Sequence, residues 1–475
     1  MNVPLLVLLP LCFVATAVQV TEQEARSCLV RAVRFFRGQV AAHGGYLWRY
    51  SHDLKYREGE GIADAETVWV QPPGTPTVGM AYLLAYERTR EPTLLEAAKA
   101  AGTCLISGQL RSGGWTYSIR FADEARRRFA YRSDPERPDA FNVSTLDDDT
   151  TQSAIRFLLH LDRVLKGRDQ DVHSALLTAL DALVKAQYPN GAFPQGFDGP
   201  SPTDCPILAA TLPPSWPRTW PNKPYWRLYT LNDNVMGDTI ATLLEAARFR
   251  RSRRLRDAAV RGSEFLLRAQ LPDPQPAWAQ QYDENMHPAW ARRFEPPAVS
   301  GGESQQVIET LLDLAEETRD RRFLQPIPRA IAYLRRSLLP DGRLARFYEL
   351  GTNRPLYCNR VYELTYDDTD TPTHYSFKVP SRLDALERHY RRLLVVLHQR
   401  KPTNTRKQPP AVPSASEVRD ILASQDARGA WVEPGTLRYH PPSIGVSQIV
   451  TTETFARNLD LLSRYIEHSL RSKRR

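Results

Sequence analysis

The segment LVKAQYPNGAFPQ, residues 183–195, decides the fold that we expect. It starts as the end of an amphipathic helix and passes through Gln187 into a turn that contains Asn190 and Gly191. The aromatic residue Phe193 follows, and the next helical stretch begins further on. This order of helix, turn and aromatic residue occurs along the whole chain.

Five further turns of this kind lie before and after that segment. They are GGYLW from Gly44, QLRSGGW from Gln109, QLPDPQPAW from Gln270, LPDGRLARFY from Leu339 and SQDARGAW from Ser424. The turns recur every 65 to 85 residues, roughly, which is the length of two helices with their connections. Between the turns, apolar residues follow helical spacing, as in residues 155–159 and 240–244.

The repeat predicts an all-α fold, an α/α toroid built from about six helical hairpins. In such a ring each hairpin buries its apolar face against its neighbours. An open helical solenoid is the alternative that the same pattern allows. We expect the site in loops at one end of the ring, because irregular segments on a rigid scaffold present polar side chains.

The ends of the chain suggest how it is divided. Residues 5–18 are apolar and Ala15-Thr16-Ala17 suits signal peptidase, so residues 1–17 are predicted to be a signal peptide; a membrane anchor or buried helix is the alternative. Residues 18–140 are predicted to complete the toroid, and residues 141–475 to form the catalytic region, with a disordered linker at 400–416. The protein is therefore expected to be secreted or periplasmic, without an integral membrane segment.

The charge balance indicates a polyanionic partner. The chain has 63 Lys and Arg against 54 Asp and Glu, a net charge of +9. Such a surface attracts polyanions, but no nucleic-acid motif accompanies the charge. For an exported protein we therefore expect an acidic polysaccharide, no nucleic acid, and a monomer.

Four polar stretches place carboxylates and amides where a helix core would not. They are TLDDDTT (145–151), YTLNDNVM (229–236), WAQQYD (278–283) and YELGTNRP (348–355). Calcium takes oxygen ligands of this kind, and Asp233 between Asn232 and Asn234 offers them. Taken alone, the Asn-Asp-Asn stretch is more typical of a helix cap for the run from Val235, and the three aspartates of TLDDDTT could also serve as a helix start.

Together these stretches resemble the family 10 polysaccharide lyases, whose members are pectate lyases. The resemblance also includes residues 183–195, 266–304, 344–357 and 451–465, so it covers residues 145–465 in order. Departures are NGAFPQ for the usual NGGWPQ, TLDD for TIDN, and a Pro-rich apparent insertion at 203–224. They bear on the substrate subsites more than on the chemistry.

The resemblance implies an α/α toroid that cleaves polygalacturonate by β-elimination, with calcium and an arginine general base. Carried over by motif, Asp233 and Asp283 are the implied calcium ligands, and Arg354 of GTNRP is the expected base with Arg346 as the fallback. Residues expected to bind substrate are Arg346, Arg292, Asn232, Asn353 and Tyr282.

Three other functions are compatible with parts of the sequence. QLRSGGW and LDDDTT resemble motifs of triterpene cyclases, which are also α/α enzymes. A non-catalytic polyanion-binding toroid would retain the positive surface charge and have no catalytic activity. A glycoside hydrolase on this scaffold would use two opposed carboxyl groups and need no calcium.

Overall fold

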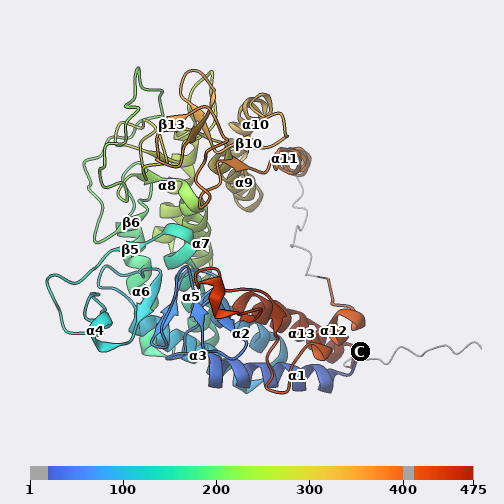
Figure 1. Cartoon of the computed structure of the whole chain (residues 1–475). Helices are drawn as coiled ribbons and strands as arrows, with labels where there is room; N and C mark the ends of the chain where they lie inside the picture. Colours follow the sequence, from blue (N-terminus) through green and yellow to red (C-terminus); the bar gives the residue numbers. More distant parts are fainter. Residues whose placement is uncertain (1–19, 399–410, 474–475) are drawn as a thin grey trace, which may run out of the picture.

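The computed structural model describes residues 20–398 and 411–473, and these form an α/α toroid, as the repeat predicts (Figure 1). Helices alternate along the chain between an inner and an outer layer. The inner helices are α2 (Thr75–Thr89), α5 (Thr150–Leu165), α7 (Val235–Arg250), α9 (Gly301–Thr318), α11 (Leu383–His398) and α13 (Thr452–Lys473). The outer helices are α1 (Glu22–Phe35), α3 (Pro92–Ser107), α6 (Gln170–Lys185), α8 (Arg253–Arg268), α10 (Ile327–Arg336) and α12 (Ala415–Ala423).

The glutamine of the repeated turn holds successive outer helices together. Gln187 follows α6, and its Nε2 donates to the carbonyl of Gly191 in its own turn (3.0 Å) and to that of Ala258 in α8 (2.9 Å). The same pair of bonds joins three other turns to the next outer helix or its start: Gln109 to Ala175, Gln270 to Pro326, and Gln425 to Cys28. Gln425 thus ties the last outer helix to the first, α1.

The glycine of the turn is needed for close approach. Gly191 has φ +91°, and a Cβ there would lie 2.1 Å from the carbonyl oxygen of Arg261 in α8. A side chain at this position would therefore push α8 away.

The tryptophan of the turn fastens it to the helix that precedes it. The indole N–H groups of Trp115, Trp278 and Trp431 donate to the carbonyls of residues near the ends of α3, α8 and α12. All three rings are buried, so each satisfies its one polar group inside the core. Each occurrence of the sequence pattern thus corresponds to one structural unit, and the ring is a repetition of that unit.

Packing around the ring is uneven. Inner helices pack closely from α13 through α2 and α5 to α7, and again between α9 and α11. Contacts between α11 and α13 are sparse within the described residues. At the turn after α10, a Cβ on Gly342 would meet no described atom within 4 Å, unlike one on Gly191. In Figure 1 the α9–α11 part accordingly stands above the part formed by α1, α2, α12 and α13.

Short antiparallel strands precede every inner helix and so lie at the same end of the ring. One sheet has the order β15 (Glu433–Pro434), β16 (Gln448–Thr451), β1 (Arg49–Ser51), β2 (Arg57–Glu58), and another β13 (Leu364–Thr365), β12 (Pro355–Cys358), β11 (Phe347–Glu349), β9 (Ala298–Ser300). The two-stranded sheets pair β3 (Thr67–Trp69) with β4 (Ser118–Arg120), β5 (Ser144–Thr145) with β6 (Gly196–Phe197), β7 (Tyr229–Thr230) with β8 (Gln281–Tyr282), and β10 (Leu344–Ala345) with β14 (Lys378–Val379).

Six short helical segments lie between these helices and strands in the described part of the chain. They are η1 (Phe36–Val40), α4 (Asp123–Arg126), η2 (Asp147–Asp149), η3 (Asn232–Asn234), η4 (Arg321–Leu324) and η5 (Pro442–Ile444). Two of them, η2 and η3, start inner helices and carry the aspartates of the polar stretches.

The predicted signal peptide, 1–17, and residues 400–410 of the predicted linker lie outside the described residues. The linker prediction is too long at its end, because α12 begins at Ala415 with the Ser414 hydroxyl accepting from the Glu417 N–H. Within the described residues, none of the helices combines the length and apolar character that spanning a membrane requires.

Candidate active site

Two turns of the same shape, η2 and η3, form the centre of the site. Each follows a two-residue strand and starts a 16-residue inner helix. Asp148 has φ 47° and ψ 38°, and Asp233 has φ 46° and ψ 36°, so both lie in the left-handed region that Asp and Asn tolerate. Asp233 is not a helix cap, because the N-cap of α7 is Asn234 and it makes no side-chain capping bond.

The two turns and the start of α9 bring together four carboxylates, those of Asp147, Asp148, Asp233 and Glu303. Burial raises the pKa of Asp233 to about 8, and the charges of Asp147, Asp148 and Glu303 add to the shift. Burial and the charges of Asp147 and Glu60 likewise raise the pKa of Asp148 to about 6. These carboxylates repel one another, so a bound cation would relieve the repulsion.

Each of the three aspartates accepts a hydrogen bond from one side chain, and for Asp233 this donor is the preceding residue of the same turn. The Tyr117 hydroxyl donates to Asp147 Oδ2 (2.8 Å), and Gln71 Nε2 donates to Asp148 Oδ2 (2.7 Å). Asn232 Nδ2 donates to Asp233 Oδ2 (2.5 Å). The other oxygen of Asp147, Oδ1, is buried and has no hydrogen-bond partner among the described residues.

Two arginines, Arg346 and Arg292, lie beside these carboxylates. Arg346 NH1 is 3.5 Å from Glu303 Oε1, and its Nε donates to the Ser376 carbonyl (2.7 Å). Its guanidinium lies 4.7 Å from the centre of the Tyr375 ring, and that of Arg292 lies 5.5 Å from the same ring. The positive charge of Arg292 lowers the pKa of Asp233, although burial outweighs it.

The charges around Arg346 decide its protonation. Burial alone would lower the pKa of Arg346, but Tyr375, Glu303 and Asp233 hold it above its ordinary value. Arg346 is therefore protonated while the acidic groups beside it keep their charge.

A cavity of about 560 Å³ opens from this cluster between α7 and α9. Asp233, Glu303 and Arg346 lie among its lining residues, and Asp238, Glu309 and Glu317 add further carboxylates. An extended polyanion would be repelled from these walls, so a polymer should approach from the loops instead.

A family model described as pectic acid lyase matches residues 109–344. The chain belongs to a pectate-lyase-like family. The match includes η2, η3 and Arg292 but ends before Arg346. No curated protein matches the chain.

Solved structures give distant likenesses to the pectate-lyase-like chain. A family 10 polysaccharide lyase from Cellvibrio cellulosa is 21% identical over 61% of this chain and 90% of its own, with a TM-score of 0.44. A point mutant of a family 10 lyase from the same organism, in complex with trigalacturonic acid, is 20% identical over 67% and 98%, with a TM-score of 0.45. A cellobiose 2-epimerase from Spirochaeta thermophila is 15% identical over 96% and 100%, with a TM-score of 0.46.

The structure of this pectate-lyase-like protein places Arg354 away from the aspartates. It lies at the tip of the β11–β12 hairpin, whereas Arg346 precedes β11 at the opposite end of that strand. The Arg354 side chain is exposed, and its guanidinium stacks on Tyr366. Of the two candidate bases, Arg346 is thus the one beside Asp233.

Asp283 is also separated from Asp233. Tyr229 pairs with Tyr282 and Thr230 with Gln281, so the antiparallel register carries Asp233 and Asp283 toward opposite ends of the strand pair. The Asp283 Oδ1 instead accepts from the N–H groups of Asn285 and His287 in its own loop. The structure joins Asp233 with Asp147 and Asp148 rather than with Asp283.

Two predicted substrate ligands have structural roles instead. The Tyr282 ring is fully buried, and its hydroxyl donates to the Ala269 carbonyl (2.7 Å) and accepts from the Ala279 N–H (2.7 Å). The Asn353 amide accepts from the Tyr333 hydroxyl and donates to Ser337 Oγ (3.0 Å). We therefore assign both side chains to packing.

Asn232, the remaining predicted amide, belongs to the site but faces the protein. Besides its bond to Asp233, its Oδ1 accepts from Gln280 Nε2 (2.7 Å). It orients Asp233 and is itself buried. The sequence marked Asn232 through its motif and Glu303 only as part of the segment 266–304, whereas Tyr375 carried no distinguishing local signal.

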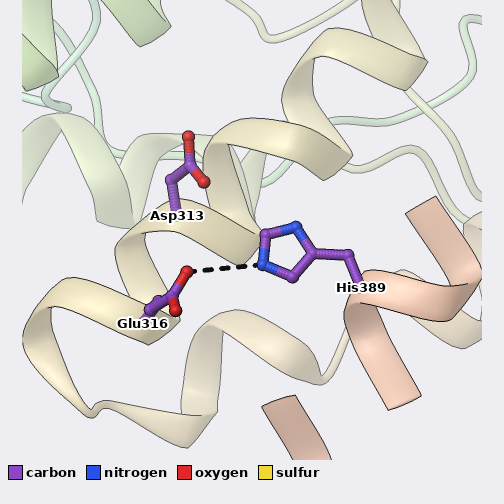
Figure 2. A group of neighbouring side chains, drawn as sticks. All are labelled: Asp313, Glu316 and His389. Atoms are coloured by element: carbon purple, nitrogen blue, oxygen red, sulfur yellow. Dashed lines mark ion pairs between the residues drawn. The ribbon is translucent and has the colours of Figure 1, made fainter. Parts of the chain in front are cut away.

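A second group of potential metal ligands lies on α9 and α11: Asp313, Glu316 and His389 (Figure 2). Their ligand atoms lie within 4.8 Å of one another, and His389 Nε2 is 3.5 Å from Glu316 Oε2. Arg392 is 3.6 Å from the same oxygen of Glu316. Since the protein already supplies a cation there, we interpret the group as ion pairs between two helices.

Proposed function

We propose that this protein is a calcium-dependent pectate lyase that cleaves polygalacturonate by β-elimination. One observation carries the proposal: Asp147, Asp148 and Asp233 gather beside Arg292 and Arg346 at one end of the toroid. Clustered carboxylates suit a cation, and arginines suit an acidic sugar. The family match to pectic acid lyases supports the substrate class.

Calcium would be held by Asp147, Asp148 and Asp233. The donor set fits this ion because it consists of hard carboxylate oxygens, and the buried Oδ1 of Asp147 has no partner among the described residues. When bound, calcium would supply positive charge that stabilises the negative charge developing on the substrate carboxylate. Glu303 is close enough to raise the pKa of Asp233 and would contribute to the same negative field.

Arg346 is our choice for the general base. It would take the C5 proton of a galacturonate while the C4–O4 bond breaks, which leaves a C4=C5 double bond and sends the electron pair to the leaving oxygen. Its guanidinium is fixed by the Ser376 carbonyl and the Tyr375 ring. Tyr375, Glu303 and Asp233 favour the protonated form of Arg346. Activity should therefore require a bound cation that offsets the charge of these carboxylates, and it should rise with pH because the base must lose its proton.

The remaining parts of the proposal concern substrate binding, cellular location and oligomeric state. Arg292 lies against the same Tyr375 ring as Arg346 and would attract a second charged group of the polymer. A polysaccharide substrate is consistent with export, and we propose a secreted or periplasmic monomer.

The test follows unsaturated product by its ultraviolet absorbance on polygalacturonate, first with calcium and then with EDTA. We expect product only with calcium. Cleavage that is insensitive to EDTA and gives no unsaturated product would favour a glycoside hydrolase, in which Asp233, with its raised pKa, would serve as the acid.

A further inference from the structure

We propose that Glu295 is the positioning residue of this site, a buried carboxylate that holds Arg292, Arg346 and Asp233 in fixed relation. The proposal rests on the function proposed above for those three groups. Glu295 itself is 1% exposed, so it cannot touch a substrate and must act through its neighbours.

The first connection is to Arg292. Arg292 Nε donates to Glu295 Oε2 (2.8 Å) and NH2 donates to Oε1 (2.5 Å), which forms a two-pronged pair. The Arg292 backbone N–H also donates to Oε2 (3.0 Å). Such a pair fixes the plane of the guanidinium as well as its position.

The second connection is to Arg346 through Tyr375. The Tyr375 hydroxyl donates to Glu295 Oε1 (3.1 Å), which sets the orientation of the ring. The guanidinium groups of Arg292 and Arg346 both lie against that ring, at 5.5 and 4.7 Å from its centre. The separation between the two arginines therefore depends on a ring that Glu295 holds.

The third connection is to Asp233 through two buried amides. Gln280 Nε2 donates to both Glu295 Oε1 (2.7 Å) and Asn232 Oδ1 (2.7 Å). Asn232 in turn donates to Asp233. Gln280 and Asn232 are almost completely buried, so this chain of hydrogen bonds has no competition from solvent.

Glu295 stays charged in this position. Burial alone would raise its pKa, but the hydrogen bonds from Arg292 and Gln280 hold the pKa of Glu295 below its ordinary value. Glu295→Gln keeps the shape and removes the charge, so it breaks the two-pronged pair. Glu295→Asp keeps the charge on a shorter side chain.

We expect Glu295→Gln to lower kcat about 10- to 100-fold, as loss of an orienting partner does, with a smaller change in KM. Glu295→Asp should recover part of the loss. Asp162→Asn is the matched control, since Asp162 is a buried carboxylate paired with His173 and Arg250. It lies near the far end of α5, about 18 Å along the helix from η2.

The results separate positioning from stability. A normal kcat in Glu295→Gln, or an equal loss in Asp162→Asn, would overturn the proposal. A second measurement does not depend on lyase activity: the ¹⁵N spectrum of arginine Nε–H groups, with the Arg292 signal identified by its loss in Arg292→Lys.

In that spectrum, the Arg292 signal should be protected from exchange in the wild type and in Asp162→Asn and should lose protection in Glu295→Gln. An unchanged signal in Glu295→Gln would refute the positioning role. A wild type without lyase activity would refute the proposed function alone, and the spectrum would still decide the role of Glu295.

Discussion

Asp233→Asn should stabilise the calcium-free protein at alkaline pH. Burial and neighbouring carboxylates raise the pKa of Asp233 from 3.8 to about 8. Between these values the folded protein holds a proton that the unfolded chain releases, so the free energy of unfolding falls as pH rises. Asparagine removes this penalty because it cannot ionise.

The size of the expected stability difference follows from the shift in the pKa of Asp233. One pKa unit corresponds to about 1.4 kcal/mol, so the wild type should lose on the order of 4 kcal/mol relative to Asp233→Asn between about pH 5 and pH 8. The two proteins should have similar stability near pH 4, where Asp233 is protonated in the folded state.

Urea unfolding in EDTA at several pH values measures the difference. Saturating calcium should then stabilise the wild type, by about 2.7 kcal/mol at one hundred times Kd, and leave Asp233→Asn unchanged. Parallel pH curves for wild type and Asp233→Asn would refute the clustered-carboxylate account.

Three further substitutions test other parts of the account. Asp147→Asn should abolish stabilisation by calcium, while Asp283→Ala should retain it; the reverse result in calcium titrations would restore Asp283 as the ligand. Arg346→Lys should lose nearly all turnover with little loss of polygalacturonate binding, and Arg354→Lys should turn over almost normally; kinetics that reverse this order would move the base to Arg354. Gln187→Met should cost about 2–4 kcal/mol in unfolding experiments, because two carbonyls lose their donor, with normal activity per folded molecule; an unchanged stability would contradict the clamp.

The ring was predictable because its determinants are local. Gln187 and Gly191 lie four positions apart, and the bond from Gln187 to the next outer helix recurs at Gln109, Gln270 and Gln425. The family was confirmed for a related reason, since its motifs are continuous segments. The linker predicted at 400–416 is too long by Ala415 and Ser416, which already belong to α12, because the sequence pattern did not show that Ser414 caps a helix there.

The site was predictable only in part, because its geometry depends on pairing between distant segments. Asp233 and Asp283 both belong to motifs that carry the family resemblance. The register of β7 with β8 nevertheless places them at opposite ends of the strand pair. The repetition of left-handed angles in η2 and η3, which joins Asp148 to Asp233, has no signature in a single segment. Only the path of β11 shows which of Arg346 and Arg354 reaches the cluster.

The mass of the products formed from polygalacturonate with calcium present distinguishes β-elimination from hydrolysis. Cleavage by β-elimination leaves an unsaturated end, so we expect oligogalacturonides that are one water molecule lighter than their hydrolytic equivalents, with none formed in EDTA. Products that all have the full hydrolytic mass, or an intact polymer after prolonged incubation with calcium, would rule out β-elimination by this protein.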